Sequence, residues 1–218
     1  MDITYLGHSS FKIRGKLAIV VTDPFDSKTV GFKYPSVEAD IVTISHDHAD
    51  HNRADLVKGV KKIVTGPGEY EILGVSIIGI SQFHDEEKGQ KRGRNTLYVF
   101  EVDGVRAAHL GDLGHELSDE VVNQIGDIDV LMIPTGGFFT IGAKEAVEIV
   151  TKIEPYYVIP MHYKVEGINL DTFSELSPVE EFLTGSGLSV EKLSKFSIKK
   201  DEVIEDQGTK VILLERKT

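Results

Sequence analysis

The sequence contains no cysteine, which excludes disulfide bonds, thiolate metal sites and cysteine nucleophiles from any function assigned to it. It also has no apolar run near the roughly 20 residues that a membrane-spanning helix needs. Residues 1–4 lack the basic segment that precedes an apolar one in a secretory signal peptide. Together these absences predict a cytoplasmic protein without a membrane span.

Positive charge is scarce, because 24 Lys and Arg stand against 35 Asp and Glu and give a formal net charge of -11. A surface of this sign repels nucleic acid and anionic membranes, so neither is an expected partner. We expect a small-molecule substrate, and a local basic patch or a bound metal would allow that substrate to be anionic. The sequence leaves the oligomeric state open.

No linker rich in Pro, Gly or Ser divides the 218 residues, so we interpret residues 1–218 as a single domain. Short segments rich in Val, Ile, Tyr and Phe predict strands at 3–6, 11–13, 17–22, 41–45, 63–65, 71–81, 96–102, 105–110, 130–134, 156–160 and 209–215, with hairpin turns near Gly74 and at Asp103-Gly104. Helices are expected at 143–153, where apolar side chains share one stripe, and at 53–58, 119–125 and 178–183. Many strands with fewer helices suggest sheets packed face to face with helices outside.

Metal-ligand side chains are concentrated in His46-Asp47-His48-Ala49-Asp50-His51, which places three imidazoles and two carboxylates in six consecutive residues. Imidazole and carboxylate are the ligands that zinc and related metals prefer when thiolate is absent. An isolated histidine is usually structural. The clustering, directly after a predicted strand, indicates metal binding here.

Other predicted strands also end in a residue of ligand type. His84, Asp112 and His162 each follow an apolar run, and Asp23 does the same. Taken alone, His84 would be a surface residue about half the time, Asp112 a turn residue and His162 a packed side chain. Because strand ends at one edge of a sheet gather functional residues, we expect these side chains to join the 46–51 cluster.

These residues, in this order, resemble the metallo-β-lactamase fold superfamily. The segments Tyr5–Phe11, Thr22–Phe25 and Ile159–Tyr163 are further similar to small metal-dependent hydrolases related to ascorbate-6-phosphate lactonases. The resemblance implies an α+β fold, a four-layer αββα sandwich in which two mixed β-sheets face each other, helices lie outside and metals sit at one edge.

The same resemblance implies a ligand set for two divalent ions, with zinc expected and manganese or iron as alternatives. His46, His48 and His84 would bind the first ion. Asp50, His51 and His162 would bind the second, and Asp112 would bridge both. Two ions about 3.5–4 Å apart can hold a hydroxide that attacks the substrate. Asp50 would also act in catalysis, orienting that nucleophile or accepting a proton.

Three further residues are candidates for contacting substrate or orienting a metal ligand: His8, Asp23 and Tyr163. Each also has a structural interpretation, as a packed histidine, a turn cap and a packed tyrosine. His109 is equally open to an orienting and a packed interpretation, whereas His115 is interpreted as a surface residue beside the pocket. The charged segment 85–94 is interpreted as a solvated loop in preference to a lid over an anionic substrate.

The sequence departs from this family branch at Phe138, where histidine is frequent, at Leu113, where threonine is frequent, and in the 85–94 loop. These differences leave the ligand set intact but put the substrate in doubt. We expect a hydrolase acting on a small ester, lactone or phosphoester. The alternatives are a phosphodiesterase or nuclease, a di-iron redox protein and a non-enzymatic metal-binding protein.

Overall fold

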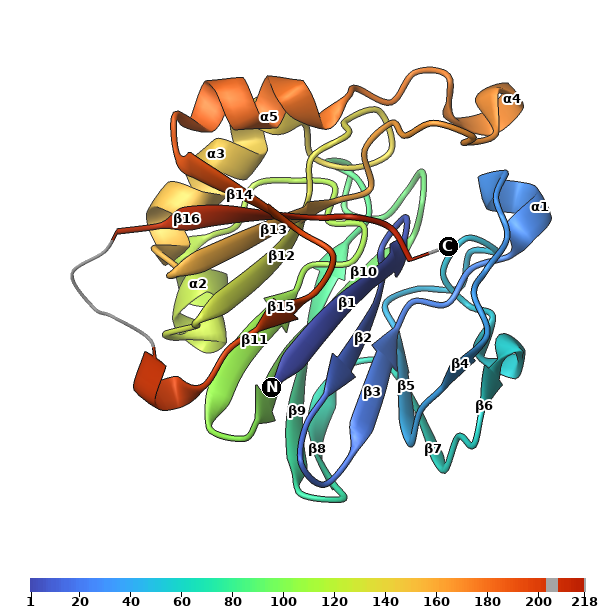
Figure 1. Cartoon of the computed structure of the whole chain (residues 1–218). Helices are drawn as coiled ribbons and strands as arrows, with labels where there is room; N and C mark the ends of the chain where they lie inside the picture. Colours follow the sequence, from blue (N-terminus) through green and yellow to red (C-terminus); the bar gives the residue numbers. More distant parts are fainter. Residues whose placement is uncertain (203–207, 218) are drawn as a thin grey trace.

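The computed structural model describes residues 1–202 and 208–217 (Figure 1). Within these residues, every helix is too short or too polar to cross a bilayer. One mixed sheet has the strand order β15-β1-β2-β3-β5-β7. Its strands are β1 (Asp2–Gly7), β2 (Ser10–Arg14), β3 (Ile19–Thr22), β5 (Ile41–Ile44), β7 (Lys62–Thr65) and β15 (Phe196–Ser197). The pairs β1–β2 and β2–β3 are antiparallel, whereas β3, β5 and β7 run parallel.

The second sheet has the order β14-β16-β13-β12-β11-β10-β9-β8. Its strands are β8 (Gly68–Ile72), β9 (Val75–Phe83), β10 (Arg94–Val102), β11 (Val105–His109), β12 (Val130–Pro134), β13 (Tyr157–Met161), β14 (Ser189–Leu193) and β16 (Lys210–Leu214). From β8 to β11 it is an antiparallel meander, and the remaining pairs are parallel. The predicted hairpin turn near Gly74 is confirmed, with Leu73 and Gly74 both at positive φ, and it divides the expected strand 71–81 between β8 and β9.

Helices cover the outer face of the eight-stranded sheet, as Figure 1 shows for α3 and α5 above β12 and β13. They are α2 (Asp119–Ile125), α3 (Ala143–Ile153) and α5 (Val179–Ser186). The predicted boundaries of the first two are confirmed, and α5 begins after its cap Pro178. The apolar stripe of α3 buries Ile149 and Val150 against side chains such as Leu131 on β12.

The expected helix at 53–58 is wrong. Only one 3-10 turn, Ala54–Leu56, forms there, and the chain continues as β6 (Val57–Lys58), which pairs with β4 (Val37–Glu38). So short a segment forms too few hydrogen bonds to offset the free-energy cost of helix nucleation. Val57 instead packs in a core with Val37 and Val42.

Alternation of side chains along the strands builds separate cores on the two faces of each sheet. On β10, Tyr98 and Phe100 point into the layer between the sheets, whereas Leu97 and Val99 pack under the helices. The outer face of the six-stranded sheet is covered by residues 25–57, including α1 (Ser27–Val30). The αββα arrangement is therefore confirmed, with a thin fourth layer. The short helix α4 (Leu170–Phe173) lies beside α1, where Asn169 N donates to Val30 O.

Candidate metal centre

The candidate ligands follow the carboxyl ends of strands that run in the same direction within each sheet. Residue 8 follows β1, residue 23 follows β3, residues 45–51 follow β5, residue 84 follows β9, residue 112 lies just beyond β11, and residue 162 follows β13. These ends meet at one edge of the facing sheets. The structure therefore places His84, Asp112 and His162 just after strand ends at this shared edge, as the sequence predicted.

Three of these residues take a left-handed backbone conformation, with φ of 55° at His8, 39° at Asp23 and 52° at His162. Such values cost free energy for a residue with a side chain and persist where the surroundings hold the backbone in place. Here each one turns a side chain into the site as its strand ends. Gly111 has φ 52°, and a Cβ there would lie 2.4 Å from Asn95 Oδ1, so only glycine fits.

His46, His48 and His84 form one group in which the candidate ligand atoms lie within 4.8 Å of one another. The ring centroids are 4.5 Å apart for His46 and His48, and 4.6 Å apart for His46 and His84. His48 is exposed, whereas the other two are buried. This group corresponds to the first predicted ion site.

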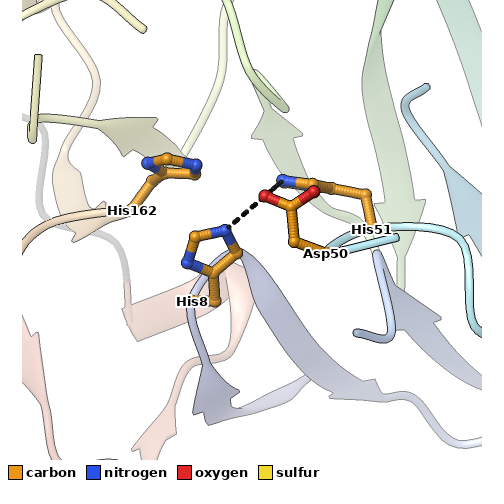
Figure 2. A group of neighbouring side chains, drawn as sticks. All are labelled: His8, Asp50, His51 and His162. Atoms are coloured by element: carbon orange, nitrogen blue, oxygen red, sulfur yellow. Dashed lines mark hydrogen bonds and ion pairs between the residues drawn. The ribbon is translucent and has the colours of Figure 1, made fainter. Parts of the chain in front are cut away.

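Asp50, His51 and His162 form a second group, and the structure adds His8 to it (Figure 2). The His8 and His162 ring centroids are 4.1 Å apart. His8 Nε2 is 3.1 Å from Asp50 Oδ2, and His51 Nε2 is 3.5 Å from the same oxygen. The residues predicted to bind the second ion therefore lie close together.

Asp112 lies between the two groups. Its Oδ2 is 3.3 Å from His84 Nε2 and 3.2 Å from His162 Nε2, and its Oδ1 is 3.2 Å from His51 Nε2. A single carboxylate therefore reaches imidazoles of both groups, which is the position of a bridging ligand.

The candidate ligand atoms at the centre of the site are better placed to coordinate a metal ion than to hydrogen-bond one another. Among the described residues, His46 Nε2, His51 Nε2, His162 Nε2 and Asp112 Oδ1 are buried and make no hydrogen bond of acceptable geometry. Leaving such atoms unsatisfied costs free energy, which coordination of a cation would recover. The donor set, imidazole and carboxylate without thiolate, fits divalent zinc, manganese or iron.

Asp23 orients ligands on both sides. Its Oδ2 accepts from His51 Nδ1 at 2.9 Å and from Ser45 Oγ at 2.6 Å. Ser45 Oγ in turn lies 2.9 Å from His46 Nδ1. With Nδ1 of each ring engaged, Nε2 of His51 and His46 is left to face a metal. Sequence analysis identified Asp23 but missed Ser45.

Burial and neighbouring charges in this cluster shift the pKa values of neighbouring imidazoles in opposite directions. Burial lowers the pKa of His46 well below its usual value, and His51 adds to the effect. Burial would lower the pKa of His51 too, but the Asp112 and Asp50 carboxylates raise it well above its usual range. Burial, with a smaller contribution from His162, lowers the pKa of His8 to about 4. His46 and His8 are therefore neutral at neutral pH and able to bind a metal, whereas His51 carries a proton when no cation is present.

His109 is buried and lies just behind the site. Its Nε2 donates to Ser9 O at 2.8 Å, and its Nδ1 accepts from Gly111 N at 3.2 Å, so both ring nitrogens are used in holding the chain before Asp112. Asn95 was missed by sequence analysis and completes this support, accepting from Asp112 N and donating to Leu110 O. A buried asparagine within an apolar strand was the available signal.

Tyr163 and His115 lie outside these ligand groups. Tyr163 is buried and lines a separate pocket with Tyr5 and Arg216, and the described residues that line it include no member of the cluster. His115 accepts from Phe83 N and donates to Glu116 O. Contact of Tyr163 with substrate stays a prediction.

Comparison with known proteins places the chain in a family. A model described as "Beta-lactamase superfamily domain" matches residues 2–162, which include every candidate ligand. A UPF0173 metal-dependent hydrolase of Thermococcus onnurineus is 32% identical over 190 residues, covering 75% of this chain and 84% of its own length.

Solved structures agree. A chain from Thermotoga maritima, named as a Zn-dependent hydrolase of the metallo-beta-lactamase superfamily, is 36% identical, with a TM-score of 0.78 over 99% of both chains. CmlA, a diiron beta-hydroxylase from Streptomyces venezuelae, is 14% identical with a TM-score of 0.63, over 98% of this chain and 53% of its own, and shares the fold alone. The fold, the ordered ligand residues and these relatives together show that the chain belongs to the beta-lactamase superfamily, among its UPF0173 metal-dependent hydrolases.

Proposed function

We propose that the protein is a dinuclear hydrolase, most suited to zinc, that cleaves an ester, lactone or phosphoester bond in a small molecule. The strongest support is the position of Asp112, whose two oxygens lie 3.2–3.3 Å from imidazole nitrogens of both histidine groups. Such a carboxylate would bridge two ions. The name of the Thermotoga maritima relative, which includes zinc, agrees with a donor set that contains no thiolate.

In this proposal the chain divides its ligands between two ions. His46, His48 and His84 hold the first, Asp50, His51 and His162 hold the second, and Asp112 contacts both. Two divalent ions so placed would lower the pKa of a bound water toward about 7 and polarise the bond to be cleaved.

Asp50 is the carboxylate best placed to handle the proton of the attacking water. Its side chain is 15% exposed, against 2% for Asp112, so it borders the space that water and substrate enter. Its pKa is held well below the usual range, because the contributions of His51 and His8 outweigh burial. Asp50 is therefore ionised at neutral pH and can orient a water molecule or accept a proton from it.

A pocket of about 520 Å³ beside His46 and Asp47 offers room for a small substrate. Its far wall includes Arg94 and Ser81, whose side chains are 3.3 Å apart. The described acidic side chains all lie beyond ion-pair distance of the Arg94 guanidinium. An anionic group on the substrate would suit that wall.

The test is to remove metal, reload the protein separately with zinc, manganese or iron, and assay lactones, carboxylic esters, phosphomonoesters and phosphodiesters. We expect turnover that depends on two ions per chain, and an Asp50→Asn variant about 100-fold or more slower with the fold retained. Turnover of phosphodiesters alone would favour the phosphodiesterase alternative. A fully loaded protein that turns over none of these substrates would favour a metal-binding role.

A further inference from the structure

His8 lies inside the second ligand group. Its candidate ligand atom is within 4.8 Å of those of Asp50, His51 and His162, and its Nε2 is 3.1 Å from Asp50 Oδ2. Figure 2 shows the four side chains converging on one small space from separate parts of the chain. From the sequence, His8 was a candidate only for orienting a ligand or contacting substrate.

The spacing of these atoms matches the edges of a metal coordination shell. With metal–ligand distances of about 2.0–2.2 Å, neighbouring ligand atoms lie roughly 3–3.5 Å apart and opposite ones roughly 4 Å apart. The His8–Asp50 and His51–Asp50 distances, 3.1 and 3.5 Å, are both neighbour distances. The His162–Asp112 distance of 3.2 Å is another.

The His8 ring is fixed in this position. The backbone carbonyl oxygen of His8 accepts hydrogen bonds from His162 N at 3.0 Å and from Tyr5 Oη at 2.9 Å, which holds the left-handed backbone in place. The side chain has no exposed surface and packs against Phe173, with ring centroids 5.1 Å apart. A cation at this site would therefore meet the imidazole without any rearrangement of the chain.

The plainer interpretation is that His8 only donates a hydrogen bond to Asp50. However, the oxygen it faces, Oδ2, also faces His51 Nε2, and Asp23 holds the His51 ring so that this nitrogen points inward. An ion shared by Asp50 Oδ2 and His51 Nε2 would lie within reach of His8 Nε2 as well. The hydrogen bond occupies the place that such an ion would take.

We propose that His8 is a ligand of the ion held by Asp50, His51 and His162, an inference that rests on the metal binding proposed above. That ion then has four ligands of its own besides Asp112. The other ion has three, and one of them, His48, is exposed. The two ions are therefore held unequally: the ion at His8 binds first and exchanges slowly, and the ion at His48 is the labile one.

The test is a titration of metal-free protein with zinc against a competing chelator, for wild type, His8→Ala, His8→Gln and the control His115→Gln. We expect two unequal affinities in wild type and in the control. Both His8 variants should weaken the tighter site by more than about 100-fold, beyond the 10–100-fold typical of residues behind a ligand. A crystal structure of the zinc-loaded wild-type protein should place His8 Nε2 about 2.0–2.1 Å from the ion at Asp50, His51 and His162.

The outcomes separate the two levels of the proposal. Wild-type affinity in His8→Gln, whose amide can still donate to Asp50, or a His8 Nε2 beyond bonding distance of the ion in the zinc-loaded wild type, would overturn ligation and leave His8 as a positioning residue. If His8→Ala does not fold, the distance from His8 Nε2 to the ion in the zinc-loaded wild-type protein decides alone. A wild-type chain that binds no zinc would overturn the proposed function and ligation together.

Discussion

The Ser45 hydroxyl lies 2.6 Å from the Asp23 carboxylate, and this contact connects the two groups of candidate ligands. Asp23 also accepts from His51 of the second group, and Ser45 reaches His46 of the first. Burial would raise the pKa of Asp23, but His51 and His109 hold it below the usual value. An ionised Asp23 therefore fixes the ring orientation of a ligand on each side.

Replacing Asp23 with asparagine should weaken both ions. In wild type, the two carboxylate oxygens accept from Ser45 N, Ser45 Oγ and His51 Nδ1. The amide has only one acceptor oxygen, and its NH₂ group would face at least one of these donors. We expect roughly 10–100-fold weaker binding and a free energy of unfolding of the metal-free protein lower by about 2–3 kcal/mol. Chelator competition and urea unfolding measure the two effects.

The matched control is Ser45→Ala, which leaves the Asp23–His51 contact in place and should weaken only the ion near His46. Equal loss of both ions in Ser45→Ala would contradict the separate roles assigned to the two contacts. Wild-type zinc binding by Asp23→Asn, despite lower stability, would make Asp23 purely structural.

Substitutions of His48 and His109 should have opposite effects, one lowering metal affinity and the other lowering the free energy of unfolding. His48 is exposed, so His48→Ala should change the unfolding free energy of the metal-free protein by less than about 0.5 kcal/mol while abolishing binding of the labile ion. His109→Ala leaves Gly111 N and Ser9 O without buried partners and should cost about 3 kcal/mol. Urea unfolding and zinc titration of both variants check this, and the reverse pattern would refute it.

Metal binding should release protons. The Asp112 and Asp50 carboxylates outweigh burial and raise the pKa of His51, so the metal-free folded protein carries a proton there at neutral pH. That proton stabilises the metal-free fold below the unfolded histidine pKa of about 6.5, and the stabilisation is lost as the pH rises through the raised value. An ion at Nε2 must displace it, so apparent metal affinity should rise with pH over the same range.

Calorimetric titration with zinc in buffers of different ionisation enthalpy measures this directly. We expect about one proton released per chain from His51. Binding heats that do not depend on the buffer would show that His51 is already neutral before the metal arrives.

The gathering of the candidate ligands could be predicted because its signals are local. The 46–51 cluster is visible in one short segment, and His84, Asp112 and His162 each end an apolar run that becomes a strand. A strand end marks the edge of a sheet whatever its neighbours are, so the gathering of these residues did not depend on knowing the strand order.

The roles of the supporting residues Ser45 and Asn95 could not be predicted, because these roles depend on which strands are neighbours. Ser45 matters only because β3 pairs with β5 and brings Asp23 alongside, and Asn95 only because β10 pairs with β11. Strand β14 escaped prediction for another reason: it is an exposed edge strand whose polar side chains carry no apolar pattern.

The charged 85–94 loop is more ordered than its composition suggests. The buried Asp85 carboxylate accepts four backbone N–H groups, from Glu87, Gly89, Lys91 and Arg92. The end of the loop returns to the metal centre, where Gly93 O accepts from the backbone N–H of His84. Asp85 thus supports the position of a candidate ligand.

Asp85→Asn should loosen this loop, since an amide has one acceptor oxygen in place of two. At neutral pH we expect faster trypsin cleavage after Lys88 and Lys91 and weaker binding of the ion near His84. The exposed Glu86→Gln in the same loop is the control. Equal cleavage rates in the two variants would show that the carboxylate does not organise the loop.

The wild-type loop should loosen only in acid. Burial alone would raise the pKa of Asp85, but the backbone N–H groups, that of Arg92 foremost, outweigh it and lower the pKa. The lowered value means that the stabilisation is complete above the unfolded carboxyl pKa of about 3.9 and is lost as the pH falls through the folded one. Hydrogen exchange at Gly89 and Arg92, corrected for intrinsic rates, should therefore show full protection at pH 5 and loss of protection below about pH 4. Protection that already fails between pH 5 and 7 would point to another titrating group.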